Sequence, residues 1–285
     1  MNLLNFTLKK DLLRGLFFLL LLGFISTSCS DDAANDADDI QQDLTEVERA
    51  SQIDQIDDTL GDLVIEAYEQ QEISESGRSS YTSGIPGCVT ITIVAQQNYR
   101  EVTLDFGTEG CIVNGHVLTG QIVFDYTRDP EAQQIMINYN LVAFTFDAKQ
   151  VLGSRTILRE LSNANGNPQF THTLDLTVVW PNGVQASREG TRIREWTQGF
   201  GTGVYTDNVF EITGDWTAHF VNGNTHTYEV ITALRREATC SNIVSGSVDV
   251  QRTNFGGIFD FGDGSCDNQA TFTFNNGTEI PITLN

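Results

Sequence analysis

From Cys88 to the C-terminus, the sequence contains apolar, β-branched runs with partial period-two alternation, and this pattern limits the possible folds more than any other feature. Such spacing places one set of side chains on one face of a β-strand. Asn-Gly turns separate the runs and supply the positive φ angles that tight hairpins need. We therefore expect an all-β domain over residues 85–285, an antiparallel meander of about a dozen strands that forms a barrel or a sandwich. The clearest runs are Val89–Val94, Gln121–Tyr126, Leu174–Trp180, Val209–Trp216 and Thr271–Phe274.

Residues 45–72 have helical spacing instead. Thr45 and Glu48 match a capping box, in which a hydroxyl and a carboxylate satisfy the first free amides of a helix. We expect one N-terminal amphipathic helix before the β domain, within a helix-and-linker segment 45–84. Its apolar stripe should pack on the β domain, and the alternative is a self-associating coiled coil.

The chain is strongly acidic, with a formal net charge of −22. Residues 31–76 contain sixteen acidic residues and one basic residue, and we interpret this charge as a solvated spacer that includes a disordered tether at 29–44. Eleven of the twelve basic residues after Gly77 are arginine, which we interpret as cross-strand ion pairs on a solvated sheet face. The basic surface that nucleic-acid binding requires is absent from the sequence.

Four of the five cysteines belong to a repeated pattern. The segment 105–111 (DFGTEGC) parallels 260–266 (DFGDGSC), and each copy follows an earlier cysteine at a similar distance. Four thiols allow three pairings, and the repeat selects one bridge per copy. We predict the disulfides Cys88–Cys111 and Cys240–Cys266.

The N-terminus has the three parts of an export signal. Basic residues precede an apolar run at 15–25, which is shorter than the roughly 20 residues that a membrane-spanning helix needs. Small residues then lead to Cys29, and this arrangement resembles a lipobox, with Ser26 where the usual pattern has leucine. The resemblance implies a signal peptide at 1–28, cleavage before Cys29 and acyl chains on that cysteine.

Further segments resemble uncharacterised β-rich surface lipoproteins of the Bacteroidota type. They are Ser30-Asp31-Asp32 after the lipobox cysteine, the turn 165–168, the segment 192–196 and the tail 259–268. The resemblance implies a lipid-anchored protein of the outer membrane that faces outside, with the periplasmic face as the alternative. It implies no catalytic residues.

Common catalytic motifs are absent from the sequence, and the four histidines are scattered singly. We therefore expect no enzyme activity, no cofactor and no metal site. The candidate binding residues are aromatic and basic, and the interpretation that we favour for their Gly-rich segment is a hairpin connection with its aromatic rings packed inward. These candidates are Arg192, Arg194, Trp196, Phe200 and Tyr205.

We expect a non-catalytic binding or structural lipoprotein, with a glycan or another envelope protein as its partner. One alternative is a barrel that binds an apolar ligand in its interior. The other is a glycan-active enzyme, which needs two convergent carboxylates.

Overall fold

The structure is a computed structural model that describes residues 31–77, 82–252 and 255–284, with side chains from Thr45 onward. The chain divides into two units, Met1–Leu44 and Thr45–Asn285. The predicted signal peptide and Cys29 lie outside the described residues.

Helix α2 (Asp31–Glu75) is much longer than the sequence pattern indicates. It begins before the capping box, so residues 31–44, which we expected to be disordered, are helical. This segment contains no Gly or Pro to stop a helix, and extending an existing helix is far easier than nucleating one. Within the described residues, no helix combines the length and the apolar character that crossing a membrane requires.

All the strands belong to one antiparallel sheet, so the predicted meander is confirmed. Its order runs from β1 to β15, and in the described residues no pairing joins these two edge strands. The sheet is therefore open, which differs from both the barrel and the sandwich. The strands are β1 (Thr90–Gln96), β2 (Tyr99–Asp105), β3 (Cys111–Val113), β4 (His116–Thr127), β5 (Gln134–Phe146), β6 (Lys149–Leu152), β7 (Ser154–Glu160), β8 (Gln169–Val179), β9 (Gln185–Gln198), β10 (Val209–Phe220), β11 (Thr225–Glu237), β12 (Ser245–Arg252), β13 (Phe255–Asp263), β14 (Gln269–Phe274) and β15 (Glu279–Thr283), with a 3-10 turn η1 (Tyr205–Asp207) before β10.

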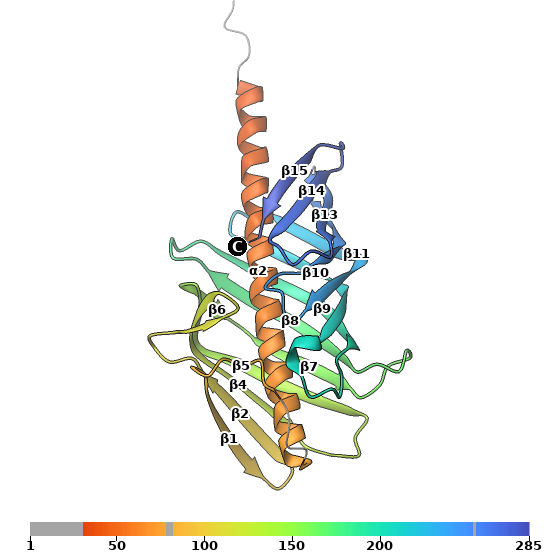
Figure 1. The fold of residues 1–285 in the computed structure, drawn as a ribbon. Coiled ribbons are helices and arrows are strands. Elements are labelled where there is room, and N and C mark those ends of the chain that lie inside the picture. Colours follow the sequence, from red (N-terminus) through yellow and green to blue (C-terminus); the bar gives the residue numbers. More distant parts are fainter. Residues whose placement is uncertain (1–30, 78–81, 253–254, 285) are drawn as a thin grey trace, which may run out of the picture. The chain divides into compact units, whose positions relative to one another are not determined.

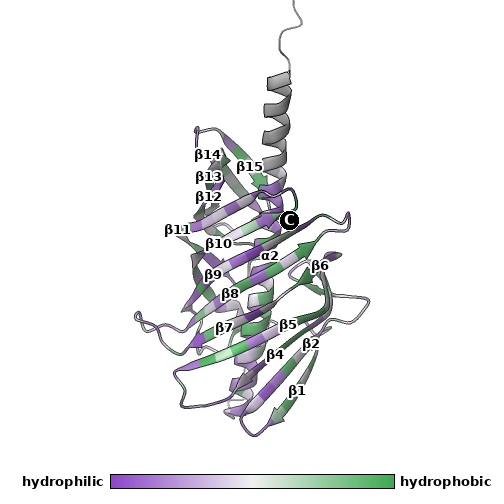
Figure 2. Cartoon of the chain, turned by 180° about the vertical axis from the view of Figure 1, so that it is seen from behind, coloured by the Kyte–Doolittle hydropathy of each residue, from purple (hydrophilic) through white to green (hydrophobic). Residues whose placement is uncertain are grey.

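The sheet curves around the helix, and residues 56–69 of α2 are buried without interruption. Helix α2 crosses the strands on one face of the sheet (Figure 1), and the opposite view shows the other face with the helix behind it (Figure 2). We call these the inner face and the outer face. Strands such as β8 alternate between buried and partly exposed residues, as expected when only one face is covered.

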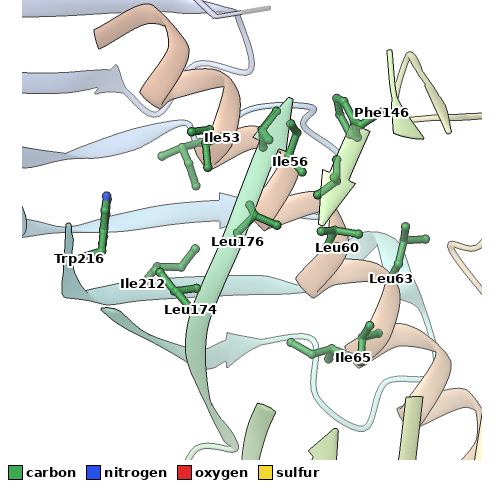
Figure 3. Close-up of a cluster of buried hydrophobic side chains, with 14 of the residues drawn as sticks. Ile53, Ile56, Leu60, Leu63, Ile65, Phe146, Leu174, Leu176, Ile212 and Trp216 are labelled. Carbon is green, nitrogen blue, oxygen red and sulfur yellow. The ribbon is translucent and has the colours of Figure 1, made fainter. Parts of the chain in front are cut away.

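The core lies between the apolar side of α2 and the inner face. Ile56 and Leu60 of the helix are fully buried together with Leu176 of β8 and Ile212 of β10. Figure 3 shows these side chains gathered where the helix crosses the strands. The predicted packing of an apolar stripe on the β domain is therefore confirmed.

Both predicted disulfides are present. Cys88 pairs with Cys111 and Cys240 with Cys266, with Cα–Cα distances of 5.7 and 5.4 Å. The first bridge ties the segment before β1 to β3, and the second ties the β11–β12 connection to the β13–β14 connection. Each closes a local loop, as the sequence repeat predicts.

Glycines allow the sheet to bend around the helix. Gly190 of β9 and Gly214 of β10 have φ angles of +147° and +128°, which side-chain-bearing residues rarely adopt. A Cβ atom at Gly214 would also collide with the carbonyl oxygen of Thr191 on the neighbouring strand. The pairing of β10 with β11 shifts register beside Gly214, so the bend coincides with a bulge.

Gly61 has a different role, because it lies in the middle of α2. A Cβ atom there would lie 2.5 Å from Arg194 Nη1 and 3.0 Å from His172 Cε1. Both side chains are buried and come from the inner face of the sheet. The missing Cβ lets the Arg194 guanidinium lie directly on the helix backbone.

We expect Gly61→Ala to destabilise the protein by about 1–3 kcal/mol, because overpacking outweighs the better helix propensity of alanine. The matched control is Gly87→Ala, since a Cβ there meets nothing within 4 Å. Urea unfolding monitored by circular dichroism measures both free energies of unfolding. A Gly61→Ala protein as stable as the Gly87→Ala protein would contradict this account.

Candidate functional site

Three of the candidate binding residues from the sequence lie on the inner face of β9. Period-two alternation brings Arg192, Arg194 and Trp196 to the same side of the strand, where all three are buried. Trp196 is only 4% exposed, so the inward-packed interpretation is confirmed for this residue. These side chains are not accessible to a ligand in solvent.

The other two candidates lie in the connection between β9 and β10. Phe200 is 45% exposed and packs edge-on against Trp196, with ring centroids 5.1 Å apart. Tyr205 is half-buried, and its ring lies against Gly84. Of the five candidates, only Phe200 is an exposed residue, so they do not form a shared binding surface.

The buried arginines instead contact acidic residues of the helix. Arg192 Nη1 lies 3.1 Å from Asp57 Oδ2 and 3.2 Å from Asp58 Oδ1, while Arg194 pairs with Asp62. We call this the helix–sheet ion-pair network. Its remaining pairs are Arg155–Asp57, Arg188–Asp54, Arg192–Asp54 at 3.5 Å, Arg236–Asp62 at 2.9 Å and Arg159–Glu69 at 3.3 Å.

These contacts correct two interpretations of the sequence. The helix acids of the network are not part of a solvated spacer, because they face arginines of the sheet; they are Asp54, Asp57, Asp58, Asp62 and Glu69. Most arginines are not on a solvated sheet face either. Arg235 alone among those in the network strands fits that interpretation, since it pairs with Glu211 on the neighbouring strand and both side chains are about one-third exposed.

Aromatic rings provide a second partner for the buried guanidinium groups. Trp216 stands opposite Gly190, and Arg188 and Arg192 lie over its ring at 4.5 and 4.9 Å from the centroid. Several nitrogens of both guanidinium groups make no hydrogen bond. A buried cation over a ring face gains electrostatic stabilisation without a hydrogen bond, which accounts for these nitrogens.

The carboxyl groups of the network respond to two opposing effects. Burial favours the neutral acid at Asp57, but the combined attraction of Arg155, Arg192 and a further arginine lowers its pKa. At the adjacent Asp58 burial outweighs the attraction of Arg192, and the pKa is raised. The two neighbouring acids therefore differ in how strongly they hold their charge.

A second buried site fixes the start of the packed helix. Glu46 is completely buried and accepts hydrogen bonds from the side chains of Asn222 and Asn224, at 2.6 and 2.9 Å. His226 Nε2 lies 2.9 Å from the same carboxylate, whereas His219 is exposed on the outer face. The β10–β11 turn thus holds the helix, and the two histidines do not face each other.

A concavity lined by described residues lies on the outer face, across β10, β11 and β12. Its volume is about 620 Å³, and it lies where both pairings of β11 shift register. We call it the outer hollow. It is lined by Gly214, Asp215, Trp216, Thr217, Thr227, Tyr228, Glu229, Val230, Asp249 and Gln251.

Strand pairing orders the outer side chains of this hollow into two rows. Asp215, Glu229 and Asp249 are successive cross-strand partners, so three carboxylates lie side by side. The second row contains Thr217, Thr227 and Gln251. Like charges placed directly opposite each other destabilise a sheet, and the lining contains no basic residue to offset them.

The three carboxylates form a line along the sheet and do not converge on one point. Among the described residues, no group of three or more histidine, cysteine or acidic side chains is placed to hold a metal ion. Adjacent strands are about 4.8 Å apart, so the row offers acceptors at regular intervals. Such an arrangement suits an extended ligand with several hydrogen-bond donors.

Sequence reasoning missed the outer hollow. The three acids lie on three different strands, and nothing in the sequence aligns them. Their alignment depends on register, which two bulges determine.

No protein-family model, curated protein or solved structure matches this chain.

His172 makes the network sensitive to pH. Burial, reinforced by Arg194 and opposed by Asp57, lowers its pKa to about 3. An unfolded histidine gains a proton below about pH 6.5, so the unfolded state binds more protons than the folded state between these values. As the pH falls through this window, His172 alone should therefore lower the free energy of unfolding by about 1.4 kcal/mol for each pH unit.

The test compares the wild type with His172→Gln, which keeps a polar side chain but does not titrate. Urea unfolding between pH 7 and pH 5 should give a steeper loss of stability for the wild type, because the other groups titrate in both proteins. Parallel profiles would show that His172 is not held neutral.

Proposed function

We propose that this chain is a lipoprotein of the outer membrane, anchored through Cys29, that faces outside the cell and binds a glycan in the outer hollow without catalysis. The observation that carries the binding role is the row Asp215–Glu229–Asp249 beside a row of hydroxyl and amide side chains. Like charges directly opposite each other destabilise a sheet, and a binding role would offset the cost of this three-residue row.

The anchor is supported by the sequence and by the cysteine pairing. Cys29 follows an apolar run that is too short to span a bilayer and ends in small residues. The other four cysteines pair with one another, so Cys29 has no cysteine partner within the chain. An unpaired cysteine at this place is what acylation requires.

The glycan is supported by the chemistry of the lining. Carboxylates accept hydrogen bonds from vicinal hydroxyl groups, while threonine and glutamine can both donate and accept. Gln251 Nε2 donates to Asp249 Oδ1 at 2.6 Å, so part of the lining is already oriented. A neutral or amine-bearing sugar fits this surface better than an anionic one, because the hollow has no cation.

Two observations favour this function over the alternatives. Asp215 and Glu229 are exposed, whereas the general acid of a glycosidase needs a carboxyl group whose pKa is raised by burial. An apolar ligand in the interior would need space, and the cavities beside α2 that described residues line measure only about 10 to 20 Å³. Each holds about one water molecule.

The anchor is tested by cell fractionation. We expect the wild-type chain in the membrane fraction and accumulation of uncleaved precursor when signal peptidase II is blocked. The Cys29→Ser protein should leave the membrane fraction after export. If that protein still fractionates with membranes, the anchor is not at Cys29.

The binding site is tested with a panel of neutral and amine-bearing oligosaccharides on an array. The triple variant Asp215→Asn, Glu229→Gln, Asp249→Asn should bind at least tenfold more weakly than the wild type, because each substitution removes an anionic acceptor.

The matched control is the double variant Asp175→Asn, Glu189→Gln. These acids are cross-strand partners on β8 and β9 and do not line the hollow. Binding to no sugar, or equal binding by the triple variant, would refute the glycan. If a basic peptide binds instead, with an affinity that falls strongly as salt is added, the ligand is a basic segment of an envelope protein.

A further inference from the structure

The two edges of the sheet differ in how they are protected. Strand β15 is short and contains Pro281, which has no N–H group to donate to a neighbouring strand. Strand β1 has seven residues, no proline and no charged residue, and every residue in it is exposed. Proteins usually block such an edge, because it offers a row of free backbone groups for pairing.

The side chains of β1 extend the core beyond the part that the helix covers. Ile91 and Ile93 are paired with Leu104 and Val102 of β2 and share their inner face. Leu104 and Val102 are buried, whereas Ile91 and Ile93 are 37% and 43% exposed. A strand placed beside β1 would cover these side chains and complete the apolar row.

We propose that β1 is an interface at which two copies of this chain pair edge to edge, as antiparallel strands about a two-fold axis. A two-fold axis through Ile93 sets Ile93 opposite itself, Ile91 opposite Ala95 and Thr92 opposite Val94. These pairs are apolar or β-branched, which is the composition that favours pairing between strands. The contact is self-complementary, as a two-fold interface must be.

Among the surfaces at which two copies of this acidic chain could meet, charge favours the β1 edge. The chain carries a formal net charge of −22, so two copies repel each other wherever acidic surfaces meet. Strand β1 brings no charged side chain to the axis, and the proposed register creates no like-charged pair within the strands. Because Pro281 interrupts the other edge, pairing through β1 ends at a dimer and does not continue into a fibre.

The test measures the mass of the mature full-length chain in excess detergent micelles, by sedimentation equilibrium over a range of concentrations. The wild type should form dimers at micromolar concentrations, and Ile93→Lys should weaken dimerisation at least tenfold, because two lysines would meet at the axis. The matched control is Met136→Lys, which places the same charge at a residue of β5 that is 47% exposed and away from the edge. This control should dimerise like the wild type.

Two further measurements distinguish a disrupted β1 interface from an unfolded variant. Val94→Lys, on the opposite side of the same strand, should also weaken the dimer, and melting temperatures report whether each variant is folded. Amide hydrogen exchange should slow in residues 90–96 as the dimer forms and stay unchanged in residues 279–283. Three results would each overturn the proposal: a monomeric wild type, an Ile93→Lys protein that dimerises normally, or dimerisation without protection of β1. A monomeric wild type would indicate that a strand of another protein pairs with this edge instead.

Discussion

A helix buried on all sides must neutralise every charge that it carries. Residues 56–69 of α2 are buried without interruption, and they include five acidic side chains. Isolated carboxylates in such a place would be protonated or would unfold the helix, because burial of an unpaired charge is very costly. The helix–sheet ion-pair network pairs four of these acids with arginines from β7, β9 and β11. The fifth, Glu66, accepts a hydrogen bond from the backbone N–H of Gly84. It also fixes how far the helix is inserted, because removing one partner of a buried pair typically costs about 3–5 kcal/mol.

Much of the fold could be predicted because it depends on local patterns. Alternation and Asn-Gly turns indicate the meander, the DFG repeat indicates both disulfides, and helical spacing indicates α2. The network could not be predicted, because an arginine at a strand position is equally compatible with the solvated face. In β9 the residue Ile193 points outward while Arg192 and Arg194 point inward, the reverse of the usual rule. The acidic face of α2, read alone, also looks like a solvated face.

On the outer face, the acidic side chains of the outer hollow are grouped without basic partners among the described residues that line it. The acidic residues of α2 are matched by arginines of the inner face, whereas Asp215, Glu229 and Asp249 gather around a hollow without any cation. The sequence cannot distinguish the two groups, since both consist of ordinary aspartates and glutamates in an acidic chain. What separates them is the register of strands that are far apart in the sequence. The same register places the bulge near Gly214 and so creates the hollow.

The order of elements along the chain has a consequence for how the protein is made. The acidic helix leaves the ribosome before its arginine partners in the sheet. Asp62 must wait for Arg236, which lies 174 residues later. Contacts of such long separation form late and slow the folding of the whole domain. During that delay the unpaired carboxylates stay hydrated and repel one another. The same charges that later form the buried ion pairs therefore first oppose premature collapse of the nascent chain.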